Sequence, residues 1–478
     1  MTTALPVVDR AVFTRYAGLS LPRHVAYPMP TWWSDVPPDE AHALRSLTAS
    51  ENPHRDLSLY LHIPFCEKMC RFCACNRTIM RRDTDGGQAR VERYIDALIA
   101  ELRERACTLA EANGRVRAVR QVHWGGGTPT FLSEEQITRL HTSCAELFNI
   151  AHDAEVSIEV DPRVTTRSQL ETLHALGFNR ISFGVQDFDP RVQEHVRRIQ
   201  PYEMVRATTE DARDIGFESV NYDLIYGLPY QTVEGIADTI ERTLGLRPDR
   251  IAFYHYAQIP DRIANQRGMH HDRLPCSDTK LRMLLDATRR FVDAGYERIG
   301  LDHFALPDER LARAIADGEI NRSFQGMTTG AELDLVGAGC SAISVYPRTA
   351  YVQNTRDPNE YADTVLAGTD PVIRGMRLSD EDAQRQAVVM ELYCKAEIDP
   401  GVLLREKGID ATPFIEGAAS SLDVLERDGL IARPDHGGVR LTDPLGRVLM
   451  RNVAAAFDGY LSKDAAWSGI SHAFSASA

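Results

Sequence analysis

Four cysteines lie within ten residues of one another. Cys66, Cys70 and Cys73 follow the spacing C-x3-C-x2-C, and Cys75 lies two residues further on. Thiolates are soft ligands that select zinc, copper(I) or iron–sulfur clusters. A [4Fe–4S] cluster is normally held by four cysteine thiolates. A cluster with only three protein ligands therefore keeps one iron open for a further ligand.

An open iron can chelate the amino and carboxylate groups of S-adenosylmethionine. An electron from the cluster then breaks the sulfonium bond and releases a 5′-deoxyadenosyl radical, a chemistry in which the protein supplies position. The alternative is zinc bound by Cys66, Cys70, Cys73 and Cys75. Structural zinc sites usually combine two separated ligand couples, and the sequence has no second couple elsewhere. The spacing therefore favours the cluster over zinc.

Glycines and a carboxylate follow two predicted strands. The segment HWGGGTPT (123–130) carries three consecutive glycines. Such a run lets the backbone approach a ligand and offer main-chain groups to it, and the alternative is a tight structural turn. Glu159 lies at the end of the third predicted strand, where it can accept hydrogen bonds from ribose hydroxyls or a cofactor amine. The alternative for Glu159 is a surface carboxylate.

The elements that must position these residues alternate regularly along the chain. Short apolar runs predict strands at 57–63, 120–124, 155–160, 180–184, 219–224 and 250–256. Amphipathic segments predict helices at 88–112, 133–149, 167–176, 200–215, 231–245 and 279–294. Six strand–helix units predict a parallel sheet with helical crossovers, either doubly wound or an open partial barrel. Both place the cysteine loop at the carboxyl end of the first strand.

The two ends of the chain differ from this pattern. Residues 1–50 are rich in proline and aromatic residues, and we expect an extended arm on a catalytic barrel at 51–370. From 371 to 478 we expect a mostly helical, winged-helix-like domain. Its predicted elements are helices at 380–396, 413–427 and about 444–461, and a hairpin at 430–442. From 377 onward this part has eleven Lys and Arg against sixteen Asp and Glu, which argues against DNA binding.

Whole-chain composition excludes several classes of protein. The net charge is −14, which argues against nucleic acid as a partner. No apolar stretch is long enough to span a membrane, and the first residues do not resemble a signal peptide, so we expect a cytoplasmic location. Nine cysteines, an odd number, make disulfides a poor explanation. The sequence gives no physical argument for dimerisation, so we expect a monomer.

Several segments, taken in order, carry a resemblance to a known family. C-x3-C-x2-C after a first strand is typical of the radical S-adenosylmethionine superfamily, whose usual fold is a partial (β/α)6 barrel. The chain also resembles the oxygen-independent coproporphyrinogen III oxidases, or coproporphyrinogen dehydrogenases. The segments that carry this resemblance are YLHIPFC, CACN, HWGGGTPT, SIEVDPR, FGVQDF, DLIYGLP, DHFA and SFQGMTT, which run from residue 60 to about 345.

The resemblance implies a [4Fe–4S] cluster on Cys66, Cys70 and Cys73 and two S-adenosylmethionine molecules. Residues implied for the first molecule are Tyr60, Gly126, Glu159 and Ile343. Residues implied for the second are Phe72, Gly127, Thr128, Gln186, Arg198, Asp223 and Ala257, with Gln325 near that site. Cys75 and His62 flank the cluster and are the candidates to assist electron or proton transfer. Arg23 is the candidate for holding substrate carboxylates.

The implied reaction is part of haem biosynthesis. A radical takes a β-hydrogen from a propionate side chain of coproporphyrinogen III, which then loses CO2 and one electron and becomes a vinyl group. Two such steps give protoporphyrinogen IX. The electron donor and the electron acceptor are partners that the sequence does not identify. An open cluster iron is sensitive to oxygen, so we expect the enzyme to work under anaerobic conditions.

The arm departs from the family pattern PRYTSYP. Here the string is Pro22-Arg23-His24-Val25-Ala26-Tyr27-Pro28, so His24, Val25 and Ala26 replace a tyrosine and two hydroxyl residues. This departure keeps open a related radical enzyme, such as a methyltransferase or a haem-degrading paralogue. A haem-trafficking relative is a further alternative. Those relatives generally lack the fourth cysteine and carry an HNxxYW motif, whereas this chain has Cys75 and no such motif.

Overall fold

The computed structural model describes residues 8–37, 40–42, 44, 45, 54–113 and 116–461. Its centre is a sheet of thirteen strands. Six of them are the predicted strands: β2 (Leu57–Ile63), β5 (Ala118–Gly126), β6 (Asn149–Val160), β7 (Arg180–Gln186), β8 (Ser219–Tyr226) and β9 (Arg250–His255). These six lie side by side in chain order, and each pairs in parallel with the next.

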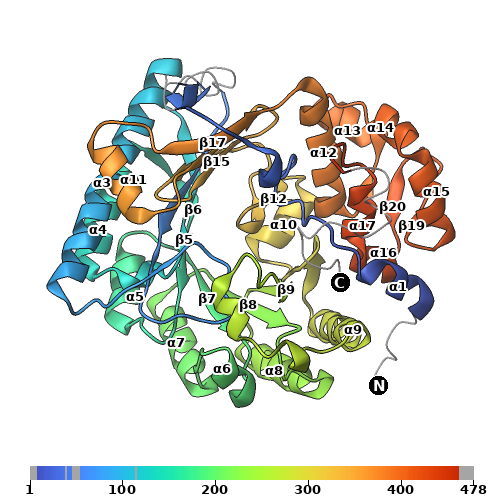
Figure 1. Ribbon diagram of the computed structural model, residues 1–478, viewed down its shortest axis with the longest axis horizontal. Coiled ribbons are helices and arrows are strands. Elements are labelled where there is room, and N and C mark those ends of the chain that lie inside the picture. Colours follow the sequence, from blue (N-terminus) through green and yellow to red (C-terminus); the bar gives the residue numbers. More distant parts are fainter. Residues whose placement is uncertain (1–7, 38–39, 43, 46–53, 114–115, 462–478) are drawn as a thin grey trace.

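The order of these strands distinguishes the two predicted architectures. A doubly wound sheet reverses its strand order at a switch point, whereas here the order runs in one direction from β2 to β9. The crossover helices cover the outside of the sheet (Figure 1). They are α3 (Asp85–Asn113), α4 (Glu134–Leu147), α5 (Arg167–Ala175), α7 (Tyr202–Ile215), α8 (Val233–Leu246) and α9 (Ser277–Asp293). The predicted partial barrel is therefore confirmed.

Local chemistry fixes where these helices begin. Ser133 and Gln136 form a capping box at the start of α4, and Thr166 and Gln169 do the same for α5. Outward-facing strand residues such as Ile158 are fully buried against the helices in the main hydrophobic cluster. Because strand side chains alternate between faces, the opposite side chains point into the barrel.

The sheet continues beyond the six predicted strands. β14 (Asp334–Ala338) pairs in parallel with β2, and β15 (Ile343–Tyr346), β16 (Ala350–Asn354) and β17 (Val372–Arg377) follow it as antiparallel neighbours. At the other end, β11 (His303–Ala305) and β10 (Glu297–Ile299) follow β9. A separate hairpin joins β12 (Ile320–Ser323) to β13 (Gly326–Thr329). The sequence did not predict these strands, because most span only three to five residues.

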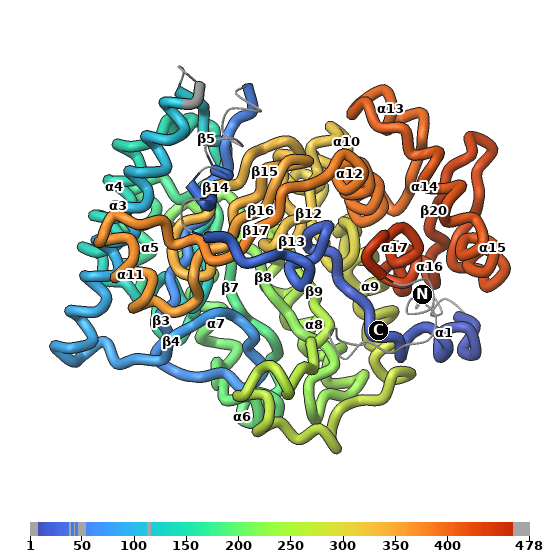
Figure 2. The backbone as a smooth tube through the Cα atoms, turned by 45° about the horizontal axis from the view of Figure 1, so that its top comes forward, coloured from blue at the N-terminus to red at the C-terminus, as the bar shows by residue number. Residues whose placement is uncertain are grey.

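The arm runs across the barrel (Figure 2). It begins with α1 (Arg10–Ala17), whose Phe13 and Tyr16 are buried in a hydrophobic cluster with the carboxyl-terminal helices. It ends on the central sheet, where β1 (Ser34–Asp35) pairs with β17. The described part of the arm therefore contacts both the carboxyl-terminal region and the far edge of the sheet.

The carboxyl-terminal region is helical, as predicted, and differs in its details. It contains α12 (Asp380–Lys395), α13 (Pro400–Lys407), α14 (Thr412–Gly417), α15 (Ala419–Arg427), α16 (Leu445–Val448) and α17 (Met450–Ala455). The single helix predicted at 413–427 was wrong, because the chain breaks it at Ala418. The helix predicted at 444–461 was also wrong, since two short helices take its place. The predicted hairpin is β19 (Ile431–Ala432) with β20 (Val439–Leu441), which also pairs with β18 (Glu397–Ile398).

Two further observations concern the chain as a whole. Within the described ranges, the model contains no helix that is both long and apolar enough to cross a membrane. The domain boundaries at residues 50 and 370 stay predictions, and β17 beyond the second boundary still pairs with the central sheet.

Candidate functional site

The cysteine loop follows β2 and is closed by a two-strand pairing of β3 (Phe65–Cys66) with β4 (Thr78–Ile79). Its three predicted cluster ligands and Cys75 line one cavity of about 250 Å³, which we call the cluster-side cavity. The Sγ atom of Cys66 lies 3.3 Å from the hydroxyl of Thr128. The Sγ atom of Cys70 accepts from Arg163 and Arg198, each at 3.6 Å.

Most of the other predicted cofactor residues line the same cavity. They are Phe72, Gly126, Gly127, Thr128, Glu159, Gln186, Arg198 and Asp223. Among the described residues, no three His, Cys, Asp or Glu side chains converge closely enough to hold one metal ion. A single zinc ion would need that convergence. The three thiolates of a [4Fe–4S] cluster need not converge on one point, because each binds a different iron.

Charge around the loop is organised by two arginines and one carboxylate. Asp161 accepts from Arg163 at 2.6 Å and from Arg198 at 3.3 Å. Burial alone would raise the pKa of Asp161, but the two guanidinium groups outweigh it and lower that pKa to about 2. Asp161 therefore stays ionised and holds both cations beside the Cys70 sulfur.

The thiols differ in how readily they lose a proton. Burial raises the pKa of Cys66 to about 11. A hydrogen bond from Cys75 lowers the pKa of Cys73 to about 6, and the same contact raises the pKa of Cys75. In this arrangement Cys73 carries the negative charge and Cys75 keeps its proton. Cys75 is thus a proton-bearing neighbour of a predicted ligand.

The glycine run is explained first by contacts within the protein. Gly126 has φ +119°, and a Cβ atom there would lie 2.6 Å from the ring of His62. A Cβ on Gly127 would lie 2.7 Å from the backbone of Pro64. The glycines therefore let β5 approach the cysteine loop, and they also form part of the cavity wall. The predicted close approach is thus explained by the chain's own packing.

His62 and Tyr60 lie beneath this loop and face each other. The Tyr60 hydroxyl lies 2.9 Å from Nδ1 of His62, whose Nε2 lies 2.9 Å from the carbonyl oxygen of Asn76. Burial lowers the pKa of His62, which favours the neutral ring. Both ring nitrogens are engaged by protein atoms. His62 therefore supports Gly126 and the end of the cysteine loop.

Glu159 lies where two cavities meet. The backbone N–H of Gly126 donates to its Oε2 at 3.1 Å, and Nε2 of His123 lies 3.4 Å from its Oε1. Burial opposes ionisation, but His123 and Gly126 outweigh it and lower the pKa of Glu159. Glu159, Ser182 and Asp223 line both the cluster-side cavity and a second cavity of about 260 Å³ inside the barrel. We call the second one the inner cavity.

The inner cavity has ends of opposite charge. Glu159 and Asp223 face the cluster side, and burial together with Glu159 raises the pKa of Asp223. Arg23 and Arg322 line the inner cavity but not the cluster-side cavity, and we call the part of the inner cavity that they line its basic end. The guanidinium of Arg23 donates to the carbonyl oxygen of His255 at 2.8 Å, which fixes the arm over the barrel.

Sequence reasoning missed a buried ion-pair network at the basic end of the inner cavity. Arg322 donates to both carboxylate oxygens of Asp302, at 3.2 and 3.3 Å. Asp302 also lies 2.8 Å from Nδ1 of His303. Asp302 and His303 stand in the family segment DHFA, and Arg322 stands just before SFQGMTT. Their place in or beside family segments was the only sequence signal for these residues. No spacing in the sequence indicates that the two segments meet.

Four of the predicted cofactor-binding residues lie outside the cluster-side cavity. Gln325 is in the two-residue turn between β12 and β13 and lines the inner cavity. Ile343 begins β15 and packs near Trp33 and Phe324. Ala257 follows β9, and its carbonyl oxygen accepts from Gln266 at 3.0 Å. Tyr60 stacks on His123, a residue that lines the inner cavity.

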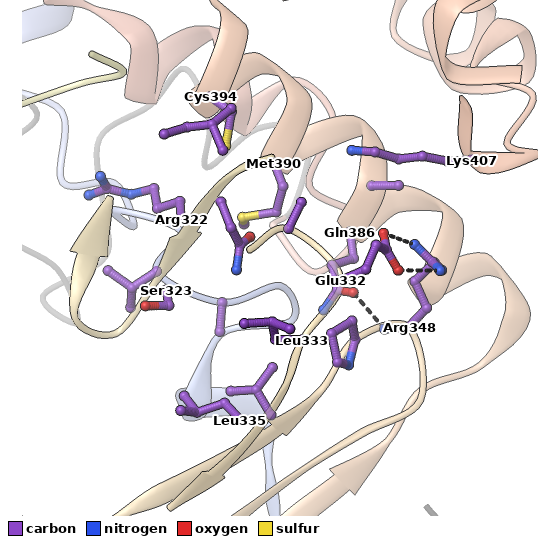
Figure 3. A pocket seen from close by; sticks show the side chains of 18 of the residues that line it. Arg322, Ser323, Glu332, Leu333, Leu335, Arg348, Gln386, Met390, Cys394 and Lys407 are labelled. Carbon is purple, nitrogen blue, oxygen red and sulfur yellow. Dashed lines mark hydrogen bonds and ion pairs between the residues drawn. The ribbon is translucent and has the colours of Figure 1, made fainter. Parts of the chain in front are cut away.

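A third, smaller cavity of about 80 Å³ lies among the arm, the β12–β13 hairpin, β15 and α12 (Figure 3). Its charged side chains are paired, since Arg348 donates to both oxygens of Glu332 at 2.7 Å. Ala26 lines this cavity and not the inner one, whereas Val25 lines both. Val25 is therefore the altered arm residue that faces the larger space.

His24, the third altered arm residue, fastens the arm. Its side chain is fully buried. Its Nε2 lies 2.9 Å from Asp458, and its Nδ1 lies 3.3 Å from the hydroxyl of Tyr393. His24 therefore joins the arm to the carboxyl-terminal region and does not line the inner cavity.

Known proteins match this chain over almost its whole length. A model of the Radical SAM superfamily matches residues 60–243. The chain is 40% identical over 457 residues to the oxygen-independent coproporphyrinogen III oxidase of Salmonella typhimurium, and the match covers 96% of each. It is 39% identical to the Escherichia coli K12 protein of the same name, again over 96% of each.

A solved structure agrees with these matches. It is Escherichia coli coproporphyrinogen III oxidase, described as a radical SAM enzyme. The two structures agree with a TM-score of 0.85 at 38% identity, over 96% of this chain and 100% of that chain.

Proposed function

The chain belongs to the oxygen-independent coproporphyrinogen III oxidases of the radical S-adenosylmethionine superfamily, and we propose that it converts coproporphyrinogen III to protoporphyrinogen IX. The observation that carries the proposal is the pair of joined cavities. Glu159, Ser182 and Asp223 belong to both, so a cofactor beside the cysteines would reach a substrate inside the barrel. The alternative functions, a related radical enzyme or a haem-trafficking protein, gain no support from the relatives. His24 and Ala26 are two of the altered arm residues that suggested those alternatives, and neither lines the inner cavity.

Superfamily membership implies a [4Fe–4S] cluster and S-adenosylmethionine. Cys66, Cys70 and Cys73 would hold the cluster. Bound there, the cluster supplies the electron that cleaves S-adenosylmethionine to a 5′-deoxyadenosyl radical. The donor set fits, because three soft thiol ligands line one cavity and the guanidinium of Arg198 lies beside one of them.

The proposal includes two S-adenosylmethionine molecules. Support comes from the distribution of the predicted contacts. Gly126 and Glu159, assigned to the first molecule, lie in the same cavity wall as most of the residues assigned to the second. Ionised Glu159 can accept from ribose hydroxyls or from a cofactor amine. Asp223 offers a second acidic group beside it.

Charge supports a position for the substrate. We assign the propionate carboxylates to the basic end of the inner cavity and to Arg23 there, because the neighbouring Arg322 already binds both oxygens of Asp302. Arginine matches a carboxylate with two parallel donors and keeps it ionised. The acidic end, beside Glu159 and Asp223, would repel carboxylates and attract the cationic cofactor. The two ligands would therefore meet in the middle of the barrel.

The reaction requires little acid–base catalysis by side chains. The β-carbon of a propionate would lose a hydrogen atom, and the bond to the carboxylate would then break to release CO2. One electron of the broken bond pairs with the unpaired electron on the β-carbon to make the vinyl double bond. One electron remains and must pass to an acceptor. The ionised carboxylate is the form that leaves, and Arg23 favours that form. The protein's main task is to hold the radical and the β-carbon together.

The electron donor and acceptor remain unidentified partners in this proposal. We also propose that the enzyme acts in the cytoplasm, under anaerobic conditions, as a monomer and without nucleic acid or membrane as a partner. These assignments rest on the sequence and on the oxygen sensitivity of an open cluster iron.

The proposal is tested by anaerobic reconstitution followed by turnover. The protein is supplied with dithionite, S-adenosylmethionine, coproporphyrinogen III and an electron acceptor. Protoporphyrinogen IX and 5′-deoxyadenosine should appear together, and a Cys70→Ser variant should load no cluster and form neither product. Cleavage of S-adenosylmethionine with unchanged porphyrinogen would contradict the assigned substrate. A Cys70→Ser protein with a full cluster would contradict the ligand assignment.

A further inference from the structure

The segment that follows β9 packs against the cysteine loop, although nearly 200 residues separate the two in sequence. It contains a short 3-10 helix, η3 (Ala264–Gly268). Of this segment, only Ala257 was predicted to belong to the site. The side chains of two adjacent residues, Asn265 and Gln266, contact the backbone of the loop that carries the predicted cluster ligands.

Asn265 binds three backbone carbonyls of the loop with one side-chain amide. The two hydrogens of its Nδ2 are shared among three carbonyl oxygens, those of Cys70 at 3.1 Å, Arg71 at 2.9 Å and Cys73 at 3.0 Å. Its Oδ1 accepts from Arg77 at 2.6 Å. Arg77 also donates to the carbonyl oxygen of Cys75 at 2.9 Å. The amide and the guanidinium thus hold both sides of the loop.

Gln266 joins the same loop to the end of β9. Its Nε2 donates to the carbonyl oxygens of Phe72 and Ala257, each at 3.0 Å. Its Oε1 accepts from the N–H of Ile259 at 2.8 Å. The side chain is fully buried. Both of its polar atoms are hydrogen-bonded to backbone groups, as a buried polar side chain requires. Phe72 and Ala257 are both assigned to the second S-adenosylmethionine.

These contacts act on the conformation of the loop. A loop that carries three ligands within eight residues must hold its backbone in one shape for the thiols to converge. Mutation of groups that orient metal ligands from behind typically lowers metal affinity about 10- to 100-fold. If Asn265 were removed, the loop carbonyl oxygens that it binds would need other hydrogen-bond donors in a crowded site.

We propose that Asn265 is a positioning residue for the cluster and that Gln266 is a positioning residue for the second cofactor molecule. Asn265 holds the backbone of Cys70 and Cys73, and Gln266 holds Phe72 beside Ala257. The part concerning Gln266 rests on the proposed second S-adenosylmethionine. The part concerning Asn265 rests only on the cysteine ligands.

The Asn265 part is tested with Asn265→Ala and Asn265→Asp, and with Arg262→Ala as the matched control. Arg262 is exposed, and it lies three residues before Asn265 on the same segment. Iron and sulfide per chain are measured after anaerobic reconstitution, together with the rate of iron loss to a chelator. Both Asn265 variants should lose iron about 10- to 100-fold faster than the control. Equal rates would overturn the proposal.

Two further readouts separate positioning from general damage. Hydrogen exchange of the apoprotein should rise at residues 70–76 in the Asn265 variants and stay unchanged in the barrel helices. The reduction potential of the retained cluster should fall in Asn265→Asp relative to Asn265→Ala, because the variant adds a negative charge behind the loop. Exchange raised across the whole barrel, or an unchanged potential, would count against a positioning role.

The Gln266 part is tested with Gln266→Met, which keeps the length of the side chain and removes its donors. We expect its cluster content to stay near that of the parent protein. The number of S-adenosylmethionine molecules bound per cluster should fall from two to one. Retention of both molecules would overturn the role of Gln266. A parent protein that binds only one molecule would instead overturn the proposed second cofactor, and the Asn265 result would still stand.

Discussion

Glu159 lines both the cluster-side cavity and the inner cavity. It is held ionised by His123 and by the N–H of Gly126, and it faces both the predicted cofactor and the inside of the barrel. A carboxylate in that position would attract a cationic cofactor and repel an anionic substrate. The charge of Glu159, as well as its shape, should therefore determine cofactor binding.

The first prediction concerns that charge. Glu159→Gln keeps the size of the side chain but removes its negative charge, so a charge-assisted hydrogen bond to the cofactor becomes a neutral one. Charge-assisted bonds contribute about 1.5–3 kcal/mol and neutral ones about 0.5–1.5 kcal/mol, so S-adenosylmethionine should bind about 5- to 13-fold more weakly. Equilibrium binding to the reconstituted protein measures this effect. Glu135→Gln, at an exposed position on α4, is the control. Equal affinity in the two variants would remove Glu159 from the cofactor site.

The second prediction concerns Arg23. Arg23→Gln removes a cation from the basic end of the inner cavity and leaves the cluster-side cavity intact. KM for coproporphyrinogen III should rise about 10- to 100-fold, since hydrogen bonds to charged groups contribute about 1.5–3 kcal/mol. Cluster content and S-adenosylmethionine affinity should stay unchanged. A normal KM with a reduced cluster content would place Arg23 outside the substrate site.

At the scale of elements, three barrel strands are joined by ion pairs. Glu155 on β6 accepts from Arg180 on β7 at 2.9 Å and from Arg250 on β9 at 3.3 Å. Burial would raise the pKa of Glu155, but Arg180 and Arg250 outweigh it and lower that pKa to about 2. These strands lie at the base of the inner cavity, so the network closes the barrel beneath the site.

The third prediction follows from this network. A carboxyl group whose pKa is lower in the folded state stabilises the protein above its unfolded pKa and loses that effect as the pH falls. For Glu155 the loss runs from about pH 4.5 down to about pH 2. The free energy of unfolding should therefore fall more steeply in the parent protein than in Glu155→Gln as the pH is lowered from 5 to 3.

Chemical denaturation at several pH values measures this difference. At pH 7 the variant should be less stable by about 3 kcal/mol, because it leaves two buried arginines with one partner fewer. Glu135→Gln should match the parent protein at each pH. Identical pH slopes for Glu155→Gln and the parent protein would mean that Glu155 titrates normally in the folded state.

At the scale of the whole molecule, the site is built from segments that are far apart in the chain. The barrel supplies the two joined cavities, the arm brings Arg23 to one of them, and the carboxyl-terminal region fastens the arm through His24 and Asp458. The segment after β9 supports the cysteine loop from behind. Removal of any of these parts would leave the site incomplete.

The sequence was informative wherever the signal was local. Alternating apolar strands and amphipathic helices predicted all six strand–helix units, and the cysteine spacing predicted the loop that lines the cluster-side cavity. Asn265 and Gln266 were missed because a side-chain amide that binds a backbone carries no spacing of its own. The pair of Arg322 and Asp302 was missed because the hairpin and β11 meet only in the folded chain.

The short strands were missed for a different reason. β15 to β17 are stable as antiparallel neighbours at the edge of a large sheet, so their pairing comes from tertiary context. The broken helix at Ala418 shows the same limitation, since one continuous amphipathic pattern covers both α14 and α15.

The central claim is that the joined cavities bring a radical at the cofactor to a propionate β-carbon of the substrate. It is tested most directly with coproporphyrinogen III deuterated at the propionate β-carbons, turned over anaerobically by the reconstituted protein. We predict 5′-deoxyadenosine that carries deuterium, together with release of CO2 and a divinyl product. Unlabelled 5′-deoxyadenosine with the porphyrinogen unchanged, or a methylated product, would contradict the claim.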